Sequence, residues 1–334
     1  MSDRRRWLLV ACMCGLLISG FHVAAQESAE KTKSKIKAKP ASADNKGAKS
    51  PVLVLVNGKK ITQADLDHLL LSRRVPPEMQ ADVRSRFLEQ LIDTRLIQGY
   101  LAERNTTATK EEVDEQVNLV RQWAQKSGKD PDKVMQELGY SEELLREEFA
   151  VPLAWKHHVD RVLTAKRVQE YFAEHHQEFD GTQVRASHIL IKIAPAAAES
   201  EIQEAEEKLK GLRSQILAKK TTFEQAAEAH SSGPSKDQGG DVGWFPWSGK
   251  MPEAFSKVAF SLKIGEMSQP FRTRFGMDLC LVTDRKPGEL SLEDVRGEVV
   301  NRLSQQLWMK TVAEQRATAK IDWKTKPQAP QGTK

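Results

Sequence analysis

The apolar residues of this chain follow two kinds of pattern, one typical of strands and one typical of helices. Val52 to Val56 form an unbroken β run that ends at Asn57-Gly58, a turn dipeptide. From Val83 to Leu101 the apolar positions recur at helical spacing and form one broad stripe. Thr109 with Glu112 is a capping box that opens the next helix. Further helical segments are predicted up to about residue 182, with a kink or break expected at Pro152.

The pattern changes at about residue 183. Residues 184–193 alternate and are rich in β-branched side chains, which predicts a strand, and residues 199–219 are predicted to be helical, with a second helix starting after Thr221-Thr222. Residues 231–252 are dense in Gly, Ser, Pro and Trp, which is typical of a structured loop. A short helix over 253–262 and a strand over 278–283 complete a compact α+β unit.

Helical spacing returns from Ser291 to about Ala319, and Ile321 to Trp323 form a candidate closing strand. A length of 334 residues indicates about two domains. The order of elements therefore predicts an α+β fold, with an α+β module inserted in a helical domain that is made from both ends of the chain.

The charge is distributed unevenly. The whole chain has a formal charge of +5, but residues 1–50 alone carry +6, so the remaining 284 residues carry −1. A nucleic-acid-binding fold needs a basic face on the fold itself, so this class is disfavoured. Hydrophobic residues at 39% and charged residues at 29% exclude a multispan membrane protein and a wholly disordered chain.

The N-terminus has the order of a secretory signal. Arg4 to Arg6 precede the apolar run Trp7 to Phe21, and Ala24-Ala25 supplies small residues for cleavage after Ala25. An uncleaved membrane anchor is the alternative, although the run is shorter than the roughly 20 residues of a spanning helix. Residues 26–50 show no apolar period and are predicted to be a basic, solvated tether. The leader predicts export to the periplasm or cell envelope, and association with a membrane surface through the leader or the tether stays open.

Cysteine and histidine usage points to no metal site and no disulfide. If the leader is removed, Cys280 stands alone, and we expect it to be a buried small apolar residue rather than a reactive thiol. His157-His158 and His175-His176 are adjacent on predicted helices, where neighbours point about 100° apart, so we expect exposed polar positions. No cofactor is predicted.

Several motifs between residues 183 and 286 resemble the parvulin-type (PpiC) peptidyl-prolyl isomerases. They are Val184 to Ile191 with His188 inside, Phe223 to His230, Gly239 to Phe245, and Gly265-Glu266. The flanking segments are similar to the exported SurA-like and PrsA-like foldases, in which the N-terminal segment and the C-terminal helix build a chaperone domain. The resemblance implies a four-stranded antiparallel sheet with surrounding helices, carried by that helical domain.

The pattern and the resemblance together divide the chain into six segments. These are a signal peptide (1–25), a basic tether (26–50), an N-terminal helical domain (51–182), a parvulin domain (183–286), a C-terminal helix and strand (287–323) and a tail (324–334).

The resemblance assigns a slot for the proline ring to Val242, Met251 and Phe255, where a leucine is usual at the first position. Ordinary core is the alternative for these residues. Nothing is broken or transferred when an X–Pro bond rotates, so an apolar slot with a few polar groups suffices.

The polar side of the site departs from the family. His188 matches the first of two active-site histidines, but Asp278 stands where the second is expected. Gly233 aligns with a cysteine or aspartate position, although Asp237 is an alternative within this loop, and Thr273 matches a hydroxyl position. A His188–Asp278 pair favours a charged imidazolium, since a carboxylate stabilises the protonated ring. We therefore expect these two residues to be hydrogen-bonded and turnover to be slow or absent.

Two functions follow as expectations. The first is an exported folding factor that binds unfolded or extended clients and isomerises their X–Pro bonds. The alternative is a non-catalytic holdase with a degenerate parvulin domain. Asp278 and Gly233 favour the alternative, whereas His188, Met251 and Phe255 favour the isomerase.

Overall fold

A computed structural model describes residues 50–325, except for residues 138 and 195. The predicted signal peptide, nearly all of the tether and most of the tail lie outside the described residues. The chain divides into two compact units: residues up to Thr164 together with those from Arg302 onward, and Ala165 to Asn301. The predicted boundaries at residues 183 and 286 lie inside the second unit and stay predictions.

Both ends of the chain meet in a three-stranded sheet of the first unit, with the strand order β2-β1-β7. The strands are β1 (Val52–Val56), β2 (Lys59–Thr62) and β7 (Ile321–Trp323). β1 pairs antiparallel with β7, which places Val54 opposite Trp323 and Val56 opposite Ile321. The closing strand expected from the sequence is therefore confirmed.

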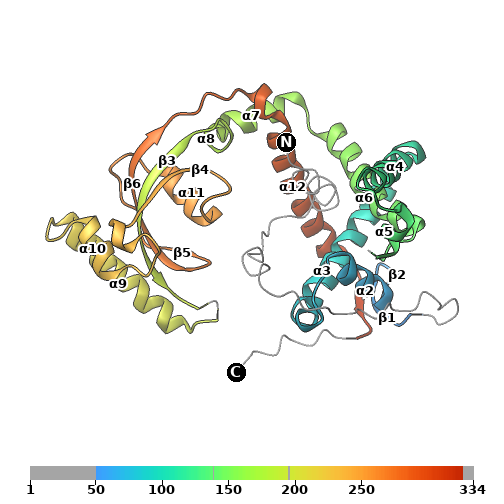
Figure 1. Ribbon diagram of the computed structural model, residues 1–334, viewed down its shortest axis with the longest axis horizontal. Helices are drawn as coiled ribbons and strands as arrows, with labels where there is room; N and C mark the ends of the chain where they lie inside the picture. Colours follow the sequence, from blue (N-terminus) through green and yellow to red (C-terminus); the bar gives the residue numbers. More distant parts are fainter. Residues whose placement is uncertain (1–49, 138, 195, 326–334) are drawn as a thin grey trace. The chain divides into compact units, whose positions relative to one another are not determined.

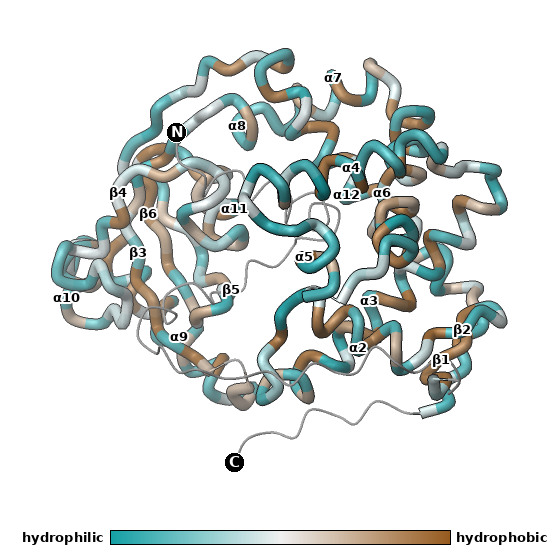
Figure 2. The backbone as a smooth tube through the Cα atoms, turned by 45° about the vertical axis from the view of Figure 1, so that its right-hand side comes forward, coloured by the Kyte–Doolittle hydropathy of each residue, from teal (hydrophilic) through white to brown (hydrophobic). Residues whose placement is uncertain are grey.

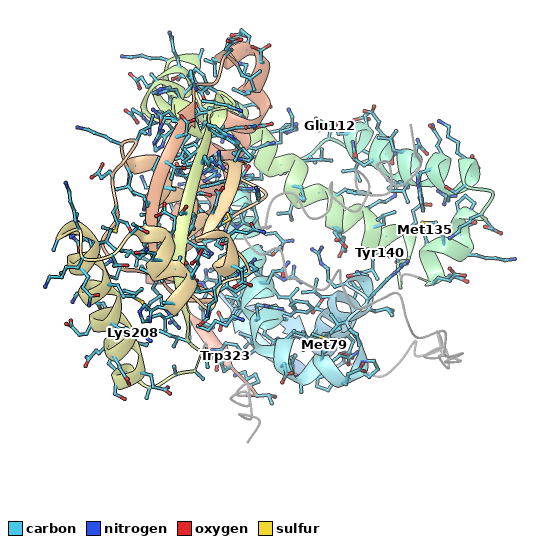
Figure 3. The ribbon with its side chains drawn as sticks, turned by 60° about the vertical axis from the view of Figure 1, so that its left-hand side comes forward. Met79, Glu112, Met135, Tyr140, Lys208 and Trp323 are labelled. Carbon is cyan, nitrogen blue, oxygen red and sulfur yellow. The ribbon has the colours of Figure 1, made fainter. Side chains whose placement is uncertain are left out.

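Among the helices of the first unit, the two that follow β2 pack against this sheet. The helices of this unit are α2 (Gln63–Ser72), α3 (Pro77–Glu103), α4 (Lys110–Lys126), α5 (Pro131–Glu137), α6 (Glu142–Val162) and, from Arg302 onward, α12 (Leu292–Thr318). Thr109 accepts from the Glu112 N–H, and the Glu112 carboxylate accepts from the Thr109 N–H, which confirms the capping box. In the turn after α5, the Tyr140 N–H donates to the Met135 carbonyl at 2.8 Å, and both residues are labelled in Figure 3.

Helix α6 continues through Pro152, so of the predicted kink or break the break is wrong, and the kink stays a prediction. The residues on either side are held by packing: Trp155 is fully buried, its indole nitrogen donates to the Ser304 hydroxyl at 3.0 Å, and its ring lies 5.0 Å from that of Trp308. Burial of this face offsets the loss of one helical hydrogen bond at the proline.

The adjacent histidines of α6 have opposite environments. His157 Nε2 lies 2.7 Å from the Glu112 carboxylate, and this hydrogen bond raises the pKa of His157. His158 is only 3% exposed and contacts Tyr100 and Arg161, so the expectation of an exposed position is wrong for this residue. Desolvation lowers the pKa of His158, and the charge of Arg161 adds to the effect.

The second unit is built on a four-stranded antiparallel sheet of order β4-β3-β6-β5 (Figure 1). Its elements are α7 (Ala165–Glu174), α8 (His176–Phe179), β3 (Gln183–Lys192), α9 (Glu199–Leu217), α10 (Phe223–His230), a short 3-10 helix (Lys236–Gln238), β4 (Asp241–Pro246), α11 (Glu253–Ser261), β5 (Phe271–Thr273) and β6 (Gly276–Lys286). The α+β class and the four-stranded sheet are confirmed.

The sheet buries both faces. On one face of the sheet, residues such as Ile189, Met277 and Leu279 pack against α9 and α10. On the other face, Val184 and Val282 pack against α11. Figure 1 shows α11 on the opposite side of the sheet from α9 and α10. Figure 2 shows the hydrophobic colour along much of β3 and β6, as expected for strands that are covered on two faces.

Two strands were not expected from the sequence. β4 lies inside the predicted loop 231–252, where glycine and a bulge interrupt the alternation of the strand. β5 has three residues and is too short to show a period. Among the described residues, no helix is both long and apolar enough to cross a membrane.

Candidate functional site

His188 and Asp278 meet on the two central strands of the four-stranded sheet. His188 lies opposite Cys280 in the register of β3 and β6, so Asp278 is its diagonal neighbour on the same face. His188 Nδ1 lies 2.9 Å from Asp278 Oδ1, and the two residues are 6% and 3% exposed. The structure therefore brings together the pair that the sequence suggested, and both side chains are buried.

Thr273 of β5 completes this polar group. Its hydroxyl donates to Asp278 Oδ2 at 2.7 Å, and the residue is buried. Each oxygen of Asp278 thus has one partner, His188 on one side and Thr273 on the other. With both oxygens engaged, the carboxylate is fixed in position and restricts the rotation of the His188 ring.

The outer nitrogen of His188, Nε2, is buried and has no hydrogen-bond partner among the described residues. A Cβ at Gly233 would lie 2.7 Å from this nitrogen, so the glycine permits the close approach of the loop. Ser231 holds the loop in place, because its hydroxyl accepts from the N–H groups of Leu190 and Gly233, both at 3.1 Å. Gly233 is therefore the loop position beside His188, whereas Asp237 is exposed in the short 3-10 helix.

The apolar residues of the predicted slot lie beside the imidazole. Phe255, from the first turn of α11, is 1% exposed, and its ring stands edge-on to the His188 ring at 5.7 Å. Val242 of β4 and Met251 before α11 are half-buried and pack against the same cluster as Phe255. Phe245 and Phe271 stand behind Phe255, each with a ring distance of 5.8 Å. The three predicted residues are thus brought together, with two of them reaching the surface.

Two cavities in the described residues lie away from this cluster. One, of about 280 Å³, is lined by the end of β3 and the first turns of α9. The other, of about 390 Å³, is lined by Ser187, Asp241 and Asp284 among others, on the face of β3 that points away from His188. Neither cavity is lined by Val242, Met251 or Phe255.

Cys280 is fully buried on the same strand face as Asp278. Desolvation raises the pKa of its thiol, and the neighbouring Asp278 adds to the effect. The thiol is therefore kept protonated and weakly nucleophilic, as expected for a small apolar core residue.

Comparison with known proteins assigns the class of this unit. Residues 188–284 match the family model described as "Rotamase: PPIC-type PPIASE domain". The foldase protein PrsA of Bacillus subtilis (strain 168) is 34% identical over 139 residues, which are 42% of each chain. PrsA of Caldanaerobacter subterraneus subsp. tengcongensis is 28% identical over 67% of this chain and 71% of the relative. The chaperone SurA of Polaromonas sp. is 34% identical over 44% of this chain and 31% of the relative.

A crystal structure of PrsA from Bacillus anthracis has 20% identity and a TM-score of 0.44 over 69% of this chain and 96% of that one. The alignments with the B. subtilis and Polaromonas relatives span less than half the length of those proteins. The second unit thus contains a parvulin-type peptidyl-prolyl isomerase domain. Beyond this domain, the chain is similar to PrsA and SurA proteins over the shares of its length given above.

Two residues of the site neighbourhood were missed from the sequence. Ser231 fastens the loop beside His188, and Lys250 bonds to β4 next to Val242. Serine and lysine in a polar loop give no pattern that distinguishes a buried or bonded side chain from a solvated one, so neither residue could be found before its contacts were known.

Proposed function

We propose that the chain is an exported folding factor that binds unfolded client proteins and catalyses the cis-trans isomerisation of their X–Pro bonds. The barrier to this rotation is about 18–20 kcal/mol, and uncatalysed exchange takes tens of seconds or more. A catalyst must hold the proline ring, remove water from the amide and bond groups that change in the twisted state.

The observation that carries the proposal is the buried His188–Asp278–Thr273 network directly beside an apolar cluster with two half-buried members. Val242 and Met251 offer apolar surface for the ring of proline, and Phe255 forms the apolar backing. His188 Nε2 is the polar atom left to bond the substrate, once the loop at Gly233 moves aside.

Asp278 acts in this scheme by orienting His188. It accepts from Nδ1, so the proton of the ring is held on the inner nitrogen, while Thr273 fixes the other carboxylate oxygen. A carboxylate stands in this place instead of the second imidazole of a dual-histidine site. We therefore propose slow turnover rather than the rate of a dual-histidine site.

Client binding is assigned to the helical unit. Several of its large apolar side chains are exposed, among them Leu71 (51%), Met79 (46%) and Leu119 (44%). The assignment itself rests on the resemblance to foldases with a helical chaperone domain, since single exposed apolar side chains are common on protein surfaces. Export rests on the order of the first 25 residues, which lie outside the described part of the structure.

The test is a protease-free exchange assay on an Ala-Pro peptide, run beside an aggregation-suppression assay on an unfolded client. Turnover that is lost in His188→Ala supports the isomerase. Suppression of aggregation without turnover contradicts it and leaves a holdase with a degenerate site. A His188→Ala variant that keeps its turnover also contradicts the role assigned to the imidazole.

A further inference from the structure

The ammonium group of Lys250 is bonded to the backbone of the strand that carries Val242. Lys250 Nζ donates to the Val242 carbonyl at 2.9 Å and to the Trp244 carbonyl at 2.8 Å. We infer that Lys250 is a positioning residue that sets the width of the proline slot. This inference rests on the proposed function, because it concerns how substrate binds to the same site.

The two carbonyl groups converge because β4 is irregular at this point. Gly243 pairs with Ala186 and Asp241 pairs with Ser187, so Val242 has no partner on β3 and forms a bulge. Gly243 has a φ of +68°, a left-handed conformation that favours glycine. This geometry lets a single ammonium group bond the carbonyls on both sides of Gly243.

The other end of the bulge is also held by a charged side chain. The Asp241 carboxylate accepts from the Gly243 N–H at 2.8 Å and pairs with Arg185 at 2.7 Å. The hydrogen bond from Arg185 lowers the pKa of Asp241, and Lys250 contributes by its charge. The bulge that turns Val242 out of the strand register is thus fixed by two side chains of opposite charge.

Lys250 also determines where the facing wall of the slot lies. It directly precedes Met251, and helix α11 begins two residues later at Glu253. The bond from the Lys250 side chain to the Val242 carbonyl therefore holds Met251 near Val242, since Met251 directly follows Lys250 and Val242 is itself the bonded residue. Phe255 follows in the first turn of α11 and is buried, so the width of the slot depends on Val242 and Met251.

Lys250 carries out this role without touching the reacting bond. Its ammonium group is committed to two carbonyls, and no contact with His188 or Asp278 is among its bonds. Loss of the bond should therefore weaken binding of the proline ring and leave the twisted state unaffected. That difference separates a positioning residue from a catalytic one.

The test compares three variants of the full chain. Lys250→Met keeps the aliphatic stem and removes the two bonds, Lys250→Arg keeps a cationic donor, and Lys257→Met removes an exposed charge from α11 as the matched control. For each protein, the Kd of an Ala-Pro peptide is measured by chemical-shift titration, and kcat and KM are measured by exchange spectroscopy.

We expect Lys250→Met to raise Kd and KM about tenfold, equivalent to about 1.4 kcal/mol, with kcat within about twofold of the parent. Lys250→Arg and Lys257→Met should both bind like the parent. Equal binding by Lys250→Met and Lys257→Met overturns the inference, and so does a fall in kcat at unchanged KM. If the parent binds the peptide without turnover, the proposed isomerase activity fails, and the comparison of Kd values still decides the role of Lys250.

Discussion

Replacement of Asp278 tests the polar network most sharply, because the carboxylate has two buried partners. Asp278→Asn keeps the shape and leaves one acceptor oxygen for His188, while its amide group can donate to the Thr273 hydroxyl. The free energy of unfolding should then fall by the difference between a charge-assisted and a neutral hydrogen bond, about 1 kcal/mol. Asp278→Ala leaves both His188 Nδ1 and the Thr273 hydroxyl without their partner. The free energy of unfolding should then fall by roughly 3 kcal/mol, as for other buried pairs that lose one partner.

These stabilities are best measured by urea unfolding followed on amide signals of β3 and β6, which report on the unit that contains the site. The turnover of an Ala-Pro peptide should fall about tenfold in Asp278→Asn, since the weaker neutral hydrogen bond orients the His188 ring less firmly and the site loses roughly 1.4 kcal/mol of transition-state stabilisation. It should be undetectable in Asp278→Ala. If Asp278→Ala unfolds at the same urea concentration and retains its turnover, the carboxylate neither supports the sheet nor orients His188, and the reasoning fails.

Three further predictions follow from contacts in the two units. Gly233→Ala should lower the unfolding free energy by about 1–3 kcal/mol and perturb the His188 signals in an NMR spectrum, because its Cβ meets Nε2 at 2.7 Å; an unchanged His188 spectrum contradicts this contact. In an NMR titration, the pKa of His157 should lie above 6.5 and that of His158 below it; the reverse order refutes both environments. Since the folded pKa of His158 is lowered, its contribution to stability is complete above pH 6.5 and declines as the pH falls below that value. His158→Gln should therefore flatten the loss of stability between about pH 7 and 5, and equal pH profiles for the two proteins would refute the assignment.

The parts of the fold that could be predicted have local signals. The Thr109–Glu112 capping box and the β run at Val52 are determined by neighbouring residues, and both have the predicted form. The closing strand at Ile321 was predictable because Ile321 to Trp323 alternate apolar, polar and apolar residues. Proximity of His188 and Asp278 was predictable from a resemblance that places them on adjacent strands.

Other features depend on contacts between residues far apart in sequence. Pro152 was expected to kink or break α6, but the helix is continuous there, and the buried Trp155 packs it against the rest of the unit. His158 looked like a polar surface position, and only the packing of Tyr100 and Arg161 shows that it is buried. β4 was not predicted because the bulge at Val242 inserts a residue and so removes the alternation that identifies a strand in a sequence.

The resemblance to parvulins named the positions of the site but not their bonding. The resemblance indicated Gly233 as a loop position. The close approach of that loop to His188 Nε2 depends on the hydrogen bond from the Gly233 N–H to the Ser231 hydroxyl, which the sequence does not reveal. Likewise Met251 was assigned to the slot, but the bond from Lys250 that holds it there has no signature in the sequence.

The central claim is that a proline ring binds against Val242 and Met251, with the His188 imidazole beside it. The most direct measurement is a set of intermolecular nuclear Overhauser effects between a bound Ala-Pro peptide and the full chain, with methionine and valine methyl groups labelled. We predict that the proline ring protons will show contacts to the Met251 and Val242 methyl groups and to the His188 ring. Contacts confined to α9, on the opposite face of the sheet, or to the helical unit would contradict the claim.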